Sequence, residues 1–463
     1  MAVVKKRKLL GEKLIEDGLI TGEQLNEALR VQARTGELLG YVLVKLGMLS
    51  EDNLNKVLGI QKIELKDEID LNLLKTVPEQ LIRKYKIFPI KKEGKYLVVA
   101  MADPLNEFSV WVRNRVDGIL REVMTLPRKM AHAVVSRIKI MGSMDIAERR
   151  VPQDGRIPLR IGGKELDLRI STMPTVFGEK VVIRILDKGN IKNYTLEKLG
   201  FGPQNLEYFK KFLKNPHGII LATGPTGSGK TTTLYTALNT INSIERNIVT
   251  VEDPVEYMLE GINQTQVNIK AGATFANYLR SILRQDPDVI MIGEIRDFET
   301  AEIAVRAATT GHLVLSTMHT NDAPGAITRL IDAGIEPFMV ASSVIGVVAQ
   351  RLVRKICKDC RQKYTPDKAE IAFAGLEKGD IVYHGVGCDK CSYTGYSGRI
   401  AVHEVLSVSP SLQSLILQKL SNEELRKAAF MEGMITLKDD GLQKVLQGVT
   451  TIKEIIRVAF REE

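Results

Sequence analysis

Apolar and polar positions alternate along this chain in blocks that predict an α/β protein. Four short apolar runs, bounded by polar residues or glycine, are typical of strands buried on both faces. They are Gly218–Leu221, Ile248–Val251, Val289–Ile292 and Leu313–Thr317. The segment 231–242, which follows the turn after the first run, has helical composition. Strands that alternate with helices indicate a mostly parallel sheet.

The start of the chain contains an internal repeat. Each copy predicts two short amphipathic helices with a glycine between them, and Thr21 and Ser50 are suited to cap the second helix of each copy. Leu10-Gly11, Leu14, Gly18, Leu25, Leu29 and Gln32 recur as Leu39-Gly40, Leu43, Gly47, Leu54, Leu58 and Gln61. We therefore expect a small tandem helical domain that ends near Gln61.

Two smaller modules follow the repeat. Residues 64–104 mix a helical part with an apolar run that closes in a strand and a turn. Farther on, the pattern predicts a helix over 136–145 and strands over Leu166–Ile170 and Val181–Leu186. These segments are expected to form a small α+β domain ahead of the parallel sheet.

Length and composition agree with these expectations and add the number of domains and the class of protein. A chain of 463 residues exceeds the size of one core, so three or four domains are expected. The net charge of +9 comes from 65 basic and 56 acidic residues that are mixed along the chain, which is weak support for nucleic-acid binding. No apolar run approaches the length of a membrane span, and the basic start lacks a signal-peptide core, so we expect a soluble cytoplasmic protein.

The first apolar run leads into a turn that is typical of a phosphate-binding loop. Glycines let backbone N–H groups converge on phosphate oxygens, and the following helix presents its positive dipole end to them. The turn is Gly224-Pro225-Thr226-Gly227-Ser228-Gly229-Lys230-Thr231-Thr232. Lys230 would neutralise the β- and γ-phosphates, and the Thr231 hydroxyl would join the shell of a magnesium ion. The loop therefore predicts binding of ATP and Mg2+.

Acids and a histidine follow the other three predicted strands. Glu256, Glu294 and His319 each stand just beyond the carboxyl end of one strand. Ligands bind at this edge of a parallel sheet, so we expect the three side chains within reach of one γ-phosphate. Hydrolysis needs one acid for the magnesium shell and another to orient and deprotonate the attacking water. Arg280 and Arg284 are four residues apart, which places them on one face of a helix. They are candidates to neutralise charge in the transition state, at this nucleotide site or at that of a neighbouring subunit.

All four cysteines fall in two C-x-x-C pairs, Cys357 with Cys360 and Cys388 with Cys391. In a reducing compartment this pattern favours metal binding over disulfides. Four thiolates leave no open coordination position, so the pattern predicts a structural Zn2+ that holds together a small carboxyl-terminal lobe.

The order and spacing of these motifs resemble the Walker A, Asp box, Walker B and His box of the type II secretion and type IV pilus assembly ATPases. The resemblance implies that Glu256 is the general base or positions the water, and that Glu294 belongs to the magnesium shell. It implies that His312 and His319 sense the γ-phosphate, and that Glu252 and Asp253 support the site. It also implies that Arg169 and Arg184 reach phosphates at a subunit boundary.

The resemblance further implies partners and a location. A homo-hexameric ring in the cytoplasm, peripheral to the inner membrane, would hydrolyse ATP and move an inner-membrane platform protein. The cytoplasmic domain of a membrane-anchored secretion component would be a second partner, and no nucleic acid is expected.

The chain departs from that family in two places. The family carries a longer segment before its Arg-x-Asp-Gly strand, whereas here Val110–Gly118 follows Asp103-Pro104 almost at once, so a block is missing. An arginine precedes the Leu-Gly of each amino-terminal repeat in members that bind cyclic di-GMP, and here Leu9 and Leu38 hold those places. Without arginine the bidentate contacts are lost, so we expect this domain to dock on a partner rather than to bind cyclic di-GMP.

Together these patterns predict a RecA-like P-loop ATPase core over 191–355. An N-terminal secretion-ATPase domain over 1–104 and a truncated sheet domain over 105–190 would precede it, and a zinc-binding helical lobe over 356–463 would follow. The expected function is the ATP-hydrolysing motor of type II secretion, with type IV pilus assembly as the nearest alternative. A RecA-like ATPase acting on DNA is a further alternative, which the single Trp makes less attractive. The last alternative is a scaffold protein that binds nucleotide but does not hydrolyse it.

Overall fold

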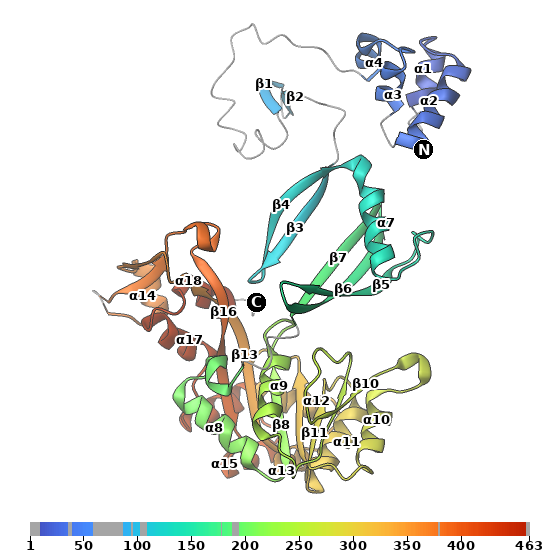
Figure 1. Ribbon diagram of the computed structural model, residues 1–463. Coiled ribbons are helices and arrows are strands. Elements are labelled where there is room, and N and C mark those ends of the chain that lie inside the picture. Colours follow the sequence, from blue (N-terminus) through green and yellow to red (C-terminus); the bar gives the residue numbers. More distant parts are fainter. Residues whose placement is uncertain are drawn as a thin grey trace, which may run out of the picture. The chain divides into compact units, whose positions relative to one another are not determined.

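The computed structural model divides into two compact units, and Figure 1 labels their helices and strands. The first is drawn from residues 1–157 and 168–184, and the second from 158–167 and 185–463. The structure describes residues 10–35, 39–58, 87–93, 96–101, 109–176, 178–187, 194–377 and 380–459. The domain limits expected at 104 and 190, and Leu9, Leu38 and Gln61 of the repeat, lie outside these residues.

The amino-terminal repeat forms four helices, as its pattern predicts. They are α1 (Leu10–Glu16), α2 (Gly22–Thr35), α3 (Leu39–Lys45) and α4 (Glu51–Leu58). Gly18 and Gly47 turn the chain between the helices of each copy with φ of +67° and +70°. The Thr21 and Ser50 hydroxyls accept bonds from the backbone N–H groups of Gln24 and Asn53, so both predicted caps are confirmed. Leu14, Leu43 and Leu54 lie in one buried core.

Two antiparallel strand pairs and a three-stranded sheet follow the repeat, and residues 158–167 and 185–187 of that sheet are grouped with the second unit. Strand β1 (Ile87–Glu93) pairs with β2 (Tyr96–Met101), and β3 (Ser109–Val116) pairs with β4 (Ile119–Pro127). After a 3-10 turn η1 (Arg128–Met130) and helix α7 (Ala131–Met141) come β5 (Gln153–Ile161), β6 (Lys164–Thr175) and β7 (Gly178–Asp187), which form a sheet in that order.

Helix α7 and the strands after it differ in extent from the prediction. The helix expected over 136–145 begins and ends earlier, because Gly142 caps it and Ser143 takes a left-handed conformation with φ of +56°. The strands expected over Leu166–Ile170 and Val181–Leu186 are confirmed but longer, since β6 and β7 meet at a tight connection.

The second unit is organised around a seven-stranded mixed sheet in the order β10-β9-β11-β12-β8-β13-β16. The four predicted strands are β8 (Gly218–Thr223), β9 (Ile248–Glu252), β11 (Val289–Ile292) and β12 (Leu313–Met318). They pair in parallel, β9 with β11, β11 with β12 and β12 with β8. Pattern analysis did not identify β10 (Asn263–Gln266), β13 (Val344–Ile356) or β16 (Tyr396–Ser407). Strand β13 runs parallel to β8 and antiparallel to β16, which makes the sheet mixed.

Helices cover both faces of this sheet. Ile219 and Leu221 of β8 face one buried cluster, and Ile220 and Ala222 face the other, because successive side chains of a strand point to opposite faces. The first face carries α10 (Phe275–Ile282), α11 (Phe298–Thr309), α12 (Pro324–Asp332), α13 (Pro337–Ser343), α15 (Pro410–Leu417) and α16 (Asn422–Met431). The second face carries η3 (Leu196–Leu199), α8 (Pro203–Lys214) and α9 (Lys230–Ile241). In Figure 1, α10 and α11 lie on the β11 side of the sheet and α8 on the β13 side.

The carboxyl-terminal part shares the sheet of the core. Strand β16 belongs to the same sheet as β8, the strand that leads into the phosphate loop, and helices α15 and α16 pack in the same buried cluster. The domain boundary expected at residue 355 therefore lies within a continuous sheet. Strands β14 (Arg361–Tyr364) and β15 (Val382–Gly385), helix α14 (Lys368–Ala374), α17 (Leu437–Leu446) and α18 (Ile452–Ala459) complete this part. Val353, Val402 and Ile455 lie in its own small core.

Among the described residues, no helix has both the length and the apolar character needed to cross a bilayer. The longest apolar run of the sequence, around residues 338–349, is divided between the short helix α13 and the sheet strand β13.

Candidate active site

The phosphate loop joins β8 to α9 and takes a conformation that requires glycine. Gly224, Gly227 and Gly229 have φ of +144°, +79° and +95°. A Cβ atom on Gly224 would lie 2.5 Å from the backbone oxygen of Gln350 on β13, so the loop packs against this strand with no room for a side chain. Pro225, Thr226 and Gly227 are exposed at the tip, whereas Ser228 is buried.

Lys230 is the first residue of α9, and only 8% of it is exposed. Its ammonium group donates to the backbone oxygens of Gly224 at 2.7 Å and Pro225 at 3.2 Å. Burial lowers the pKa of Lys230 to about 8; the nearby Glu294 carboxylate raises that pKa, and Arg351 lowers it. The amine is therefore held inside the loop beside Glu294, where an incoming phosphate would favour its charged form. Thr231 and Thr232 follow at the start of the helix, exposed and half-buried.

Glu294 and His319 lie together at the carboxyl edge of the sheet. His319 Nε2 is 3.5 Å from Glu294 Oε2, and Arg296 pairs with the other carboxylate oxygen. The Thr317 hydroxyl donates to the backbone oxygen of Gly293 at 2.7 Å, which ties the ends of β12 and β11. The backbone N–H of Thr320 donates to the Thr223 hydroxyl at 2.8 Å. The loop with His319 is thus fastened to the strand that leads into the phosphate loop.

Two acids follow β9 in different environments. Glu252 is its last residue and is buried, and burial raises the pKa of its carboxyl. Glu256 is half-buried in the irregular segment that follows, and its backbone N–H donates to the Tyr235 hydroxyl of α9 at 3.2 Å. Asp253 between them is exposed. Parallel pairing of β9 with β11 brings this segment to the edge that carries Glu294.

His312 lies at the amino-terminal ends of the parallel strands, opposite the carboxyl ends that carry His319. The pairing of β12 with β8 begins at Leu313 with Gly218 and ends at Met318 with Thr223, so His312 precedes the strand and His319 follows it. At the rise of a parallel strand the two residues are roughly 20 Å apart. The His312 ring contacts the backbone oxygen of Ala307 at 2.9 Å. The expectation that His312 meets the same phosphate as His319 does not fit this position.

Two candidate arginines lie on or next to α10 and the other two in the first unit. Arg280 of α10 pairs with Glu299 of α11, and Arg284 donates to the backbone oxygen of Arg280 at 2.9 Å. Both belong to the face of the sheet opposite α9. Arg169 lies on β6 and is half-buried, and Arg184 lies on β7 and is exposed, both in the first unit.

Gln350 and Arg351 of β13 are site residues that the sequence reasoning missed. The buried Gln350 amide donates to the backbone oxygen of Ser228 at 2.8 Å and accepts from the Thr233 hydroxyl at 2.9 Å. Arg351 donates to the backbone oxygen of Asn321, two residues after His319, at 2.9 Å. The signal was two polar residues within an apolar run, which on a buried strand must have polar partners.

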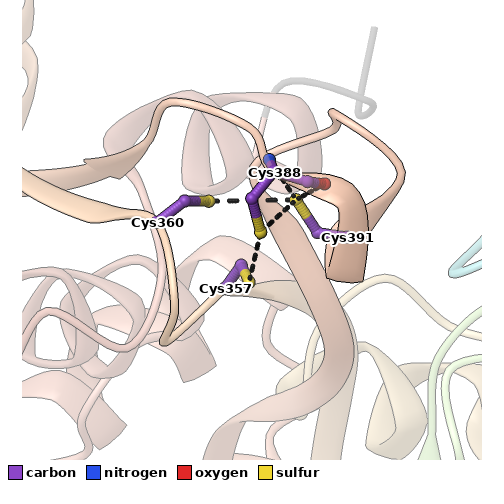
Figure 2. Close-up of side chains that lie close together, drawn as sticks. All are labelled: Cys357, Cys360, Cys388 and Cys391. Carbon is purple, nitrogen blue, oxygen red and sulfur yellow. Dashed lines mark hydrogen bonds between the residues drawn. The ribbon is translucent and has the colours of Figure 1, made fainter.

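The four cysteines gather in one cluster, with their sulfur atoms pointing toward one another (Figure 2). The sulfur of Cys357 is 3.9 Å from that of Cys388, Cys360 is 3.8 Å from Cys391, and Cys388 is 3.7 Å from Cys391. These separations exclude disulfides. They match the edge of a tetrahedron with zinc–sulfur bonds of about 2.3 Å, which is about 3.8 Å. The residues present therefore fit a tetrathiolate site.

Backbone N–H groups surround the cysteine sulfurs. Gly387 donates to Cys360, and Cys388 and Gly395 donate to Cys391, at 3.2–3.3 Å. Burial raises the pKa of the Cys391 thiol, but these donors outweigh it and bring the pKa to about 6. These donors thus favour the thiolate form of Cys391, whereas burial raises the pKa of the Cys360 thiol to about 12.

Comparison with known proteins places this geometry among secretion ATPases. The family model "Type II/IV secretion system protein" matches residues 104–457, and the MshEN domain model matches 59–110. The type II secretion system protein E of Dickeya dadantii is 54% identical over 352 residues, which cover 76% of this chain and 70% of the relative. The crystal structure of the pilus retraction motor PilT with bound ADP has 25% identity and a TM-score of 0.51, and covers 75% of this chain and 89% of PilT.

A second relative matches nearly the whole chain. The type IV pilus assembly ATPase PilB of Myxococcus xanthus is 40% identical over 555 aligned positions, which cover 96% of this chain and 98% of the relative. Because this chain has 463 residues, the relative contains positions that have no counterpart here. This agrees with a missing block, although the expected junction near residues 104–110 lies largely outside the described part of the chain.

Replacing Lys230 by alanine is expected to weaken ATP binding about 100-fold, because it removes the ammonium group that would neutralise the β- and γ-phosphates. Isothermal titration with a non-hydrolysable ATP analogue measures the effect. Lys214→Ala, which removes an exposed lysine from the end of α8, is the control and should bind like the native chain. Equal affinity of the Lys230→Ala and native chains would contradict the assignment of the loop.

Replacing Gln350 by leucine is expected to weaken ATP binding about tenfold, because the Ser228 backbone oxygen loses its buried donor. Thr233→Val removes only the contact of Gln350 with α9 and keeps its bond to the loop, so a smaller effect is expected. The same titration compares the two variants. If both lose affinity equally, Gln350 acts on the helix rather than on the phosphate loop.

Proposed function

The chain belongs to the type II/IV secretion system protein family, and on that premise we propose that it is the ATP-hydrolysing motor of a type II secretion system. Its relatives are secretion and pilus ATPases, and the chain is an ATPase of this family that uses ATP and Mg2+. The observation that carries the proposal is the carboxyl edge of the sheet. There Glu294 lies 3.5 Å from His319 and acts electrostatically on Lys230 of the phosphate loop, whose pKa its carboxylate raises.

Each group at this edge has a proposed task. Lys230 and the N–H groups of the loop bind the β- and γ-phosphates. Thr231 and Glu294 offer oxygen ligands to a magnesium ion or its water shell, and the ion reduces the charge of the phosphates when bound. His319 donates to the γ-phosphate and is oriented by Glu294.

Glu256 is the proposed general base. Its carboxylate accepts a proton from a water molecule as the water oxygen attacks the γ-phosphorus, and the bond from that phosphorus to the β–γ bridging oxygen breaks. ADP leaves with the bridging oxygen, and inorganic phosphate carries the oxygen of the water. Glu252 and Asp253 support this segment.

The arginines support a ring rather than an isolated chain. Arg280 lies on α10 and Arg284 just after it, on the face of the sheet opposite α9, and Arg169 and Arg184 lie on strands of the first unit. In a homo-hexamer, arginines of one subunit neutralise charge at the site of its neighbour. We propose such a ring, in the cytoplasm and peripheral to the inner membrane. Its partners would be the platform protein and the cytoplasmic domain of a membrane-anchored secretion component.

Assembly of type IV pili is the second candidate function. It is favoured by one observation, the match to PilB over 96% of this chain and 98% of the relative, which includes the amino-terminal part. The matches to type II secretion proteins cover 76% of the chain at higher identity. Co-purification with the platform protein of one system or the other distinguishes the two functions.

We also propose that Cys357, Cys360, Cys388 and Cys391 bind one structural Zn2+. The fit of their sulfur separations to a tetrahedral site supports this, as do the N–H groups directed at them. Zinc bound by four thiolates would link β13 to the start of β16 in a part of the chain with a small core.

Glu294→Gln is expected to lower the ATP hydrolysis rate at least about 100-fold, because the amide cannot hold the magnesium shell, while ATP still binds. Phosphate release at saturating ATP and titration with ATP analogue measure the two effects. The control is Glu302→Gln, which alters an acid paired with Arg306 within α11. A native chain that binds ATP but releases no phosphate would instead support a scaffold.

The purified chain is expected to contain one zinc per chain by elemental analysis. All four cysteines of the sequence lie in the cluster, so thiol titration reports on this site alone. Thiols should react slowly until a strong chelator removes the metal, and residues 357–400 should then become sensitive to protease. Cys388→Ser serves as a variant with reduced zinc content. Four reactive thiols and no metal in the native chain would refute the site.

A further inference from the structure

Tyr235 occupies a position that none of the tasks above explains. It lies on α9, in the second turn after Lys230, and is fully buried. Its ring packs edge-on against Tyr257 with ring centroids 6.3 Å apart. Its hydroxyl donates to the Glu252 carboxylate and accepts the backbone N–H of Glu256 at 3.2 Å. One side chain of the phosphate-loop helix therefore contacts both ends of the segment that carries Glu256.

Glu252 is a rigid anchor for that hydroxyl. The carboxylate is 3% exposed and accepts the Thr250 hydroxyl at 2.7 Å and the Gln264 amide at 3.0 Å in addition to Tyr235. Burial and the adjacent Glu252 raise the pKa of the Tyr235 phenol far above neutrality, so the phenol keeps its proton. Because the proton is directed to Glu252, the oxygen lone pair is left to accept the N–H of Glu256.

We propose that Tyr235 is a positioning residue for hydrolysis, which fixes the backbone of Glu256 relative to the helix that holds the phosphates. This inference rests on the proposed ATPase function. The nucleotide phosphates sit at the start of α9, and the general base sits on the segment after β9. A hydrogen bond from that helix to the backbone of Glu256 sets the distance between base and phosphate. Small displacements of a catalytic group cost much of the rate, so the bond matters more for hydrolysis than for binding.

Tyr235→Phe tests the inference, since it removes one oxygen and keeps the ring. The expected result is a fall in kcat of about tenfold, with the dissociation constant for a non-hydrolysable ATP analogue changed less than about twofold. Thr250→Val is the matched control. It removes another buried hydroxyl donor from the same Glu252 carboxylate but keeps the Tyr235 hydroxyl that accepts the Glu256 N–H. Its kcat should stay within about threefold of the native value.

Amide hydrogen exchange supplies a readout that does not depend on activity. In the native chain the Glu256 N–H should be protected, and in Tyr235→Phe exchange should rise over residues 253–257 while β8 and β9 remain protected. Rapid exchange of the native Glu256 amide overturns the inference without any variant. So does an equal fall of kcat in Tyr235→Phe and Thr250→Val, or a Tyr235→Phe variant with native kcat.

The outcomes separate this inference from the proposed function. If the native chain hydrolyses ATP and Tyr235→Phe does so equally well, the ATPase assignment stands and the role of Tyr235 is wrong. If Tyr235→Phe loses ATP binding and protection throughout the core, Tyr235 only supports packing, and the inference is again overturned. A native chain without hydrolysis contradicts the proposed function itself, and the exchange of Glu256 is then the remaining test of the contact.

Discussion

The parallel register of the central strands is the constraint on which the site depends. Strand β8 pairs with β12 from Gly218 to Thr223, and β11 pairs with both β12 and β9. Each strand is buried on both faces, so its register is set by two layers of packing and cannot shift without exposing apolar side chains. Because the strands share one direction, the phosphate loop, Glu294, His319 and the Glu256 segment all emerge at one edge.

Strand β13 connects this edge to the cysteine cluster. Gln350, in the middle of the strand, holds the phosphate loop, and Cys357 follows directly after the strand ends. The backbone N–H of Cys357 donates to Gly395 at 2.9 Å, just before β16 begins at Tyr396. A metal at the cluster would therefore clamp the ends of two strands that are antiparallel neighbours.

Buried polar groups position the loops that carry His319 and Glu256. Asp322, just beyond His319, is almost buried and pairs with Arg426 of α16, and the backbone N–H of Ala323 donates to the buried Glu404 at 2.8 Å. Burial of such groups costs free energy unless they have polar partners, so the Asp322–Arg426 pair and the Glu404 bond favour one arrangement of this segment. The His319 loop is thus connected to α16 and β16, as the Glu256 segment is connected to α9 through Tyr235. These contacts hold the His319 loop and the Glu256 segment in defined positions at the carboxyl ends of the strands.

The sequence by itself determined the local features of this protein. The glycine pattern 224–229, the apolar strands, the repeat of the first helices and the cysteine spacing each depend on backbone conformation or burial over a few residues, so short-range pattern is sufficient to identify them. It did not determine that β13 and β16 complete the core sheet, that Gln350 reaches the phosphate loop, or that Tyr235 meets Glu256. Those contacts join segments far apart in the chain, and pairing of strands and buried polar groups depends on which surfaces meet. The motif resemblance gave His312 and His319 the same role, but the pairing of β12 with β8 decided that only His319 lies at the edge that carries Glu294, because the length of the strand separates the two histidines.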